Sequence, residues 1–67
     1  MAFEIKRGDW WEFTTNTGIM TRHVKSVASN GMVSYLDSGG KFCQCSIETF
    51  RRWCKGAELT YRIPGAP

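Results

Sequence analysis

The sequence predicts an all-β fold: one small barrel of five strands with a single short helical turn before the last strand. Three observations lead to this prediction. Apolar and polar residues alternate over several short segments, which is the pattern of half-buried β-strands. Turn-forming residues such as Asn30-Gly31 separate these segments. Helical spacing is evident in one place, where Phe50 and Trp53 follow the fourth segment.

Each expected strand lies between turn residues. Gly8-Asp9 is expected to form a turn that begins the first strand, and Thr15-Asn16-Thr17-Gly18 a turn that ends it. Residues 1–7 form a lead-in, which is expected to be an edge strand or a flap over one end of the barrel. The five expected strands are residues 10–14, 19–28, 32–36, 41–46 and 58–63.

The second strand and its following turn carry more specific predictions. Val24 and Val27 are both expected in the core but are three residues apart, which indicates a β-bulge near Lys25-Ser26. Asn30-Gly31 is the strongest hairpin signal in the chain and favours a type I′ turn.

The helical turn has its own boundary signals. Ser46 is a good N-cap, because its hydroxyl can accept a hydrogen bond from the first turn of a helix. Gly56 is expected to end the turn. With Phe50 and Trp53 pointing inward, the arginines between them, residues 51 and 52, are expected to project outward.

Trp10 and Trp11 are adjacent, so a regular strand places them on opposite faces. We expect Trp11 in the core. Trp10 is then either exposed, where Phe42 or Met32 could join it in an apolar patch, or covered by the lead-in segment. The expected core consists of Trp11, Phe13, Val24, Val27, Val33, Tyr35, Cys45, Ile47, Phe50 and Leu59.

The length of the chain limits what it can build. Its 67 residues are expected to form one domain over residues 1–63, with a flexible tail at 64–67. A domain of this size buries only about 60% of the surface of its unfolded chain and has little room for a deep pocket that excludes water. We therefore expect a binding module rather than an enzyme.

The cysteines and the N-terminal segment bear on location. The first residues carry mixed charge and lack the apolar stretch of a signal peptide, and no apolar run reaches the ~18 residues of a membrane span. Three cysteines are an odd number, which favours reduced thiols. We expect a cytoplasmic protein without membrane contact.

Part of the chain resembles known small barrels. Val33-x-Tyr35-x-Asp37-x-Gly39, two short alternating stretches and Phe50-Arg51 resemble the central hairpin of Tudor-type domains. The start at Gly8-Asp9 is similar to the first strand of the wider SH3-like group, which includes Tudor, KOW and chromo-barrel modules. The resemblance covers residues 8–54 and implies a five-stranded SH3-like barrel with a binding role. Ser38 and Gly40 replace two members of the Tudor aromatic cage, so the resemblance does not imply recognition of methylated side chains.

A second resemblance supports an alternative function. The plasmid-borne type II dihydrofolate reductases are also short SH3-like barrels, and they assemble around a shared pore. Their Val-Gln-Ile-Tyr strand corresponds to Cys43-Gln44-Cys45-Ser46 here, which does not match. The alternatives to a binding module are therefore an oligomeric enzyme with a shared pore and a self-associating structural protein. In its size the chain also resembles small accessory proteins of phages and mobile elements.

Four residues are candidate metal ligands. Cys43, Cys45, Cys54 and His23 could form a Cys₃His zinc site, since thiolates and imidazole suit zinc. The Cys-x-Cys spacing on a strand instead favours small apolar residues that face the core. We expect no metal, no cofactor and no catalytic residue, and we leave the convergence of these four residues open.

Basic residues predict the binding surface. The chain carries a net charge of +3, and its cations gather near residues 6–7, 22–25 and 51–55. Cations contact phosphate and an exposed tryptophan stacks on a base, so we expect nucleic acid or a protein as the partner, or a second copy of the chain. A mildly basic solvated surface is the alternative. The candidate binding residues are Trp10, Arg22, Lys25, Arg51 and Arg52.

Overall fold

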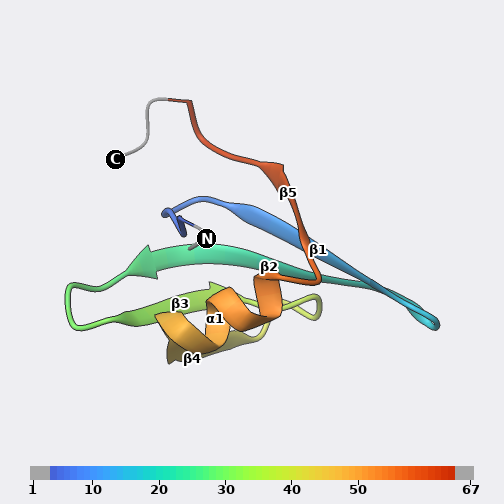
Figure 1. Ribbon diagram of the computed structural model, residues 1–67, viewed down its shortest axis with the longest axis horizontal. Coiled ribbons are helices and arrows are strands. Elements are labelled where there is room, and N and C mark those ends of the chain that lie inside the picture. The colour runs from blue at the N-terminus through green and yellow to red at the C-terminus, as the bar shows by residue number, and fades with distance from the viewer. Residues whose placement is uncertain (1–3, 65–67) are drawn as a thin grey trace.

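The structure is a computed structural model that describes residues 4–64. All five strands join one antiparallel sheet in the order β4-β3-β2-β1-β5 (Figure 1). The predicted all-β class, the five strands and the helix before the last strand are confirmed. Phe3 and most of the predicted tail lie outside the described residues. The elements are β1 (Trp10–Thr15), β2 (Gly18–Val27), β3 (Met32–Leu36), β4 (Phe42–Ser46), α1 (Ile47–Cys54) and β5 (Glu58–Tyr61).

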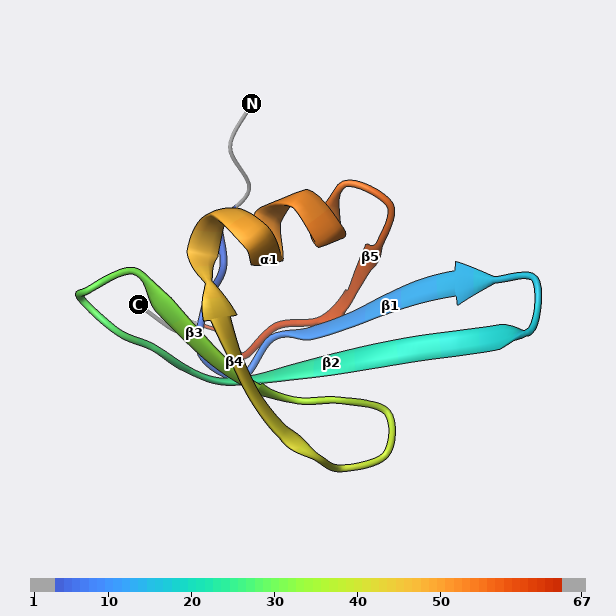
Figure 2. The same ribbon diagram turned by 90° about the horizontal axis from the view of Figure 1, so that it is seen from below.

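The sheet is strongly bent, and α1 lies across one of its faces (Figure 2). We call the face toward α1 the inner face and the opposite one the outer face. The hairpin of β1 and β2 extends past the other strands, so its tip is not covered by the helix. Because side chains alternate along a strand, each strand contributes residues to both faces.

Two predictions about register are confirmed. Trp11 is 5% exposed and belongs to the core, whereas Trp10 is 41% exposed on the outer face. The ladder between β2 and β3 shifts between Val24 and Ser26, which is the expected bulge. The bulge returns the apolar side chains of β2 to the inner face as the strand bends.

A second bulge was not predicted. Consecutive residues Trp10 and Trp11 pair with Tyr61 and Leu59, so Thr60 is the extra residue on β5. The sequence shows an even spacing between Leu59 and Tyr61, which by itself places both on one face. The bulge separates them: Leu59 packs against the core and Tyr61 is 53% exposed.

The turn between β2 and β3 differs from the prediction. A type I′ turn needs positive φ at both central residues. Gly31 has a φ of 87°, but no non-glycine residue among 4–64 has a positive φ, so Asn30 is not left-handed. The loop instead spans 28–31, with a hydrogen bond of 3.1 Å from Gly31 N to Ala28 O, and Asn30 Oδ1 accepts a bond from Met32 N. The longer loop requires only one left-handed residue, and the type I′ prediction is wrong.

The helix begins as predicted but is longer than one turn. Thr49 N donates to Ser46 Oγ at 3.2 Å, which confirms the N-cap. The helix continues to Cys54, which follows Phe50 by four residues and is buried on the same side. This pair extends the apolar contact of the helix with the sheet over a second turn.

Every predicted core residue is buried or half-buried. Ile5 and Cys54 are two further buried members that were not predicted. Ile5 shows that the lead-in acts as a flap, since no strand forms over residues 4–9. Among the predicted residues, the buried ones are Trp11, Val24, Val33, Tyr35 and Phe50, and the others are half-buried.

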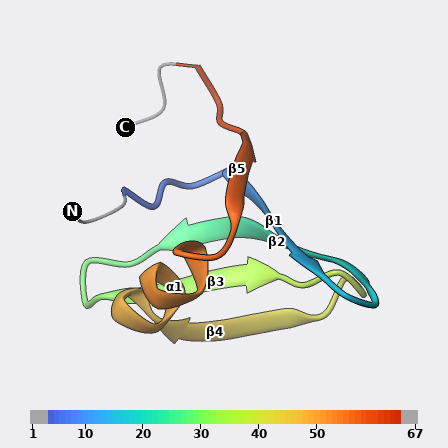
Figure 3. The same cartoon turned by 45° about the vertical axis from the view of Figure 1, so that its right-hand side comes forward.

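A buried ion pair joins the two ends of the described chain. Asp9 is 0% exposed, and its carboxylate accepts hydrogen bonds from Arg62 Nε at 2.9 Å and Nη2 at 2.7 Å. Arg62 Nη2 also donates to Glu4 O, and Lys6 N donates to Asp9 Oδ2. The bonds to Asp9 raise the pKa of Arg62 above its ordinary value. This Asp9–Arg62 clamp fixes the residue after β5 to the segment before β1, which lie side by side in Figure 3.

Candidate functional site

The outer face carries a stacked pair of rings. Trp10 on β1 and His23 on β2 are cross-strand partners, and their rings lie parallel within 6° at a centroid distance of 4.0 Å. Such pairs form where directly opposite residues project from the same face. Burial and then the charge of Lys25 lower the pKa of His23, so its ring is neutral at pH 7. Each ring covers one face of the other, so the pair is an uncharged stack of which Trp10 is the more exposed part.

A shallow hollow lies beside this pair, with two cations in its lining. Arg7 and Lys25 are exposed there, next to His23. Gly8 permits the close approach of the chain after β5, because its φ is 89° and a Cβ atom would collide with Ile63. The hollow is lined by Arg7, Gly8, His23, Val24, Lys25 and Ile63.

The ring pair belongs to a longer row of side chains that crosses the sheet. Trp10 pairs with Tyr61 on β5, and His23 pairs with Leu36 on β3. Leu36 in turn pairs with Phe42 on β4, which is 59% exposed. Since cross-strand partners share a face, one row of rings and one leucine spans all five strands. We call these residues the outer row: Tyr61, Trp10, His23, Leu36 and Phe42.

The charge differs on the two sides of the outer row. Toward the turn of residues 15–18, the next outer residues of β1 and β5 are Glu12 and Glu58, which are cross-strand partners. Toward the opposite side, Arg7 and Lys25 line the hollow. An anionic ligand on the row is therefore attracted to the side of the hollow and repelled from the side of the glutamates.

Arg22 lies on the inner face, away from Trp10. Its guanidinium carbon is 4.3 Å from the ring centroid of Trp53, 4.6 Å from that of Tyr35 and 5.6 Å from that of Phe50. Arg22 is the partner of the buried Trp11, so the alternation of β2 directs it toward the helix. These cation–π contacts connect the sheet to α1.

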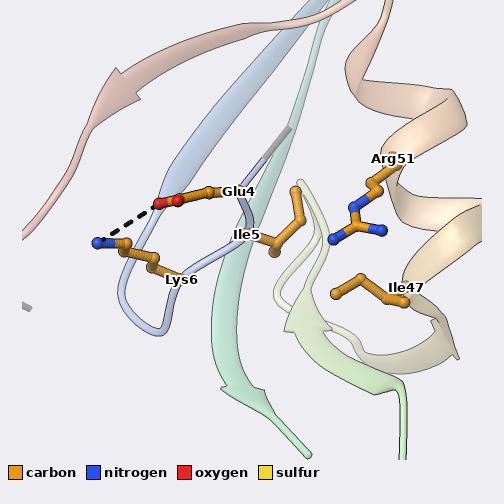
Figure 4. A pocket seen from close by; sticks show the side chains of 5 residues that line it. All are labelled: Glu4, Ile5, Lys6, Ile47 and Arg51. Atoms are coloured by element: carbon orange, nitrogen blue, oxygen red, sulfur yellow. Dashed lines mark ion pairs between the residues drawn. The ribbon is translucent and has the colours of Figure 1, made fainter. Parts of the chain in front are cut away.

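Arg51 and Arg52 lie on α1, across the sheet from Trp10. Arg51 is half-buried and reaches between Ile5 and Ile47, in a second shallow hollow that Glu4 and Lys6 also line (Figure 4). Glu4 and Lys6 form an ion pair at 3.6 Å. This hollow carries both charges and lacks an exposed ring among its lining residues.

Arg52, the next residue on α1, is exposed and lines neither of the two hollows described above.

Of the five predicted binding residues, the structure brings Trp10 and Lys25 together on the outer face. It places Arg22 inside and the two helix arginines on the other side. Sequence reasoning missed His23 and Arg7 as neighbours of Trp10, because their proximity depends on the register between strands.

The thiols face away from His23. Cys43 and Cys45 pair with the inner residues Tyr35 and Val33, and Cys54 is buried on the side of α1 that faces the sheet. Burial raises the pKa of Cys54 to about 12 and also raises that of Cys45, so both stay protonated at pH 7. Over residues 4–64, no three of the His, Cys, Asp and Glu residues lie close enough to hold a metal ion.

No family model, curated protein or solved structure gives a significant match to this chain. The only helix described for residues 4–64 has eight residues, and it is too short to cross a membrane.

Proposed function

We propose that the protein is a non-enzymatic binding module that binds nucleic acid through its outer face. The observation that carries this proposal is the exposed stack of Trp10 on His23 beside a hollow that contains Arg7 and Lys25. This site combines aromatic rings with positive charge. Proteins that bind single-stranded nucleic acids without base-specific contacts use the same two kinds of group.

Each element contributes a different kind of binding energy. Contact between a cation and a phosphate releases counterions, so affinity falls as salt rises. Stacking of a base on an aromatic side chain contributes about 1–3 kcal/mol and depends little on salt. The proposal therefore assigns salt dependence to Arg7 and Lys25 and a salt-independent part to Trp10.

The test is fluorescence anisotropy with a labelled mixed-sequence DNA of about 12 nucleotides over a range of salt concentrations. Trp10→Ala is expected to weaken binding by about 1–3 kcal/mol without changing the salt dependence. Lys25→Gln is expected to reduce the slope of log K against log salt by about 0.7, the value for one phosphate contact of a single strand. Arg52→Gln removes the same charge from an exposed site on α1 and serves as the matched control.

Two results would contradict the proposal. One is undetectable binding of DNA and RNA at low salt, which would favour a protein partner or self-association. Light scattering then distinguishes the two, because a self-associating protein or a pore-forming enzyme has a mass several times that of one chain. The other is an equal effect of Arg52→Gln and Lys25→Gln, which would place the phosphate contacts on the helix side.

A further inference from the structure

We infer that the nucleic acid is single-stranded and lies along the outer row, across the strands, with its phosphates on the side of Arg7 and Lys25. This inference rests on the proposed function and adds the form of the ligand, its path and its length. It combines the register of the four ladders with the charges on either side of the row.

The ring surfaces favour a single strand. A base can stack on Trp10 only if its own face is free, and bases inside a duplex already stack on one another. Trp10 and His23 stack on each other within β1 and β2, so neither ring projects from a loop or a helix that could insert it into a duplex. Unpaired bases meet no such obstacle, and they stack on aromatic side chains without regard to sequence.

The row sets the length of the site. Neighbouring strands are about 4.8 Å apart, so five strands place Tyr61 and Phe42 about 19 Å from each other along the sheet. A stacked single strand rises by about 3.4 Å per nucleotide, which gives about six nucleotides over that span, and fewer where the bases are splayed apart. Four of the five side chains in the row are aromatic and the fifth is Leu36, so every strand contributes an apolar or aromatic side chain to the row.

The charges set the side on which the backbone runs. Glu12 and Glu58 face each other on one side of the row and repel phosphate, whereas Arg7 and Lys25 line the other side. A backbone on the side of the hollow brings phosphates to both cations while a base stacks on the face of Trp10 that His23 leaves free. Lys41 is exposed next to Phe42, on the side of the glutamates, because the turn before β4 lies beside Thr21, the partner of Glu12.

The experiment compares oligothymidylates of 2, 4, 6, 8 and 10 nucleotides and a hairpin duplex by competition against the labelled DNA. Affinity is expected to rise steeply up to about six nucleotides and then to level off, and the duplex is expected to bind at least about tenfold more weakly. Phe42→Ala and Tyr61→Ala are each expected to weaken binding of the six-nucleotide strand by about fivefold or more. Ile19→Ala is the control, since Ile19 is exposed on the outer face but pairs with Thr14, outside the row.

Two further variants test the stacking and the side of the backbone. Trp10→Phe keeps a ring and is expected to restore most of the affinity that Trp10→Ala loses. Lys25→Gln lowers the salt slope, whereas Lys41→Gln is expected to leave it unchanged. Urea denaturation of each variant confirms that it is folded before its affinity is compared.

The outcomes separate this inference from the proposed function. Absence of all binding overturns both. Binding that depends on Trp10 and Lys25, but not on Phe42 and Tyr61, supports the proposed function and overturns the path along the row. Equal affinity for the duplex, or affinity that keeps rising in even steps beyond six nucleotides, likewise overturns the inference alone.

Discussion

Replacing Arg62 with alanine should strongly destabilise the fold. The change removes three hydrogen bonds, two to the carboxylate of Asp9 and one to the carbonyl oxygen of Glu4. It leaves the carboxylate of Asp9 buried, with Lys6 N still donating to it. Removing one partner of a buried ion pair costs about 3–5 kcal/mol.

The size of the effect follows from the exposure of the two partners. The side chain of Arg62 is 31% exposed, so water can reach the place that it leaves, and we expect a loss near the lower limit, about 3 kcal/mol. A domain of 67 residues has a free energy of unfolding of roughly 3–10 kcal/mol. The single substitution should therefore remove about 30% or more of the stability.

The measurement is urea denaturation followed by tryptophan fluorescence, for Arg62→Ala, Asp9→Asn and the double variant. The two changes should not be additive, because either one alone breaks the same ion pair. Arg52→Ala, an exposed arginine on α1, is the matched control and should change the free energy of unfolding by less than about 0.5 kcal/mol. If Arg62→Ala is as mild as the control, or if the two changes add, the clamp does not hold the ends of the chain together.

Three further predictions concern titration and charge. Burial raises the pKa of Cys54 from 9.0 to about 12, so its contribution to the free energy of unfolding is complete below pH 9 and is lost as the pH rises toward 12. In urea unfolding between pH 8 and 11, Cys54→Ala should therefore show a smaller decline of stability with pH than the unmodified protein. Burial and Lys25 lower the pKa of His23 below 6.5, so the native state resists protonation and its stability should fall as the pH drops from 6.5 through that lower pKa. If the melting temperature of His23→Gln falls with pH as steeply as that of the unmodified protein, His23 is not the cause. Glu58→Gln should stabilise the fold by about 0.2–1 kcal/mol, because Glu58 is directly opposite Glu12, and a gain that persists in high salt would show that charge is not the cause.

Much of the fold was predictable because local patterns specify it. The alternation in the first four strands, the odd spacing of Val24 and Val27 and the N-cap at Ser46 are visible within a few residues, and each is confirmed. The bulge at Thr60 was not predictable, since it is defined by the partners of Trp10 and Trp11 on another strand. The turn at Asn30 was predicted wrongly because two loop lengths suit the same residues.

The candidate site was less predictable, because it depends on contacts between distant segments. The alternation of β1 placed Trp10 on the face opposite Trp11 but left open whether it is exposed or covered by the lead-in segment; the structure shows it 41% exposed. Its stacking on His23 depends on the register of β1 and β2, and the approach of Arg7 depends on the turn at residues 6–9. The burial of Asp9 had no signal in the sequence, since its partner Arg62 is 53 residues away.

Arg22 and His23 are consecutive, yet one lies over three rings beneath the helix and the other stacks on the outer face. A shift of β2 by one residue would exchange these two positions and place a histidine among the inner rings. The strand therefore cannot slide to suit a new ligand without undoing the contact between sheet and helix. The contacts of Arg22 on the inner face fix the register of β2. A different binding specificity on the outer face can therefore evolve only by exchange of the outer side chains.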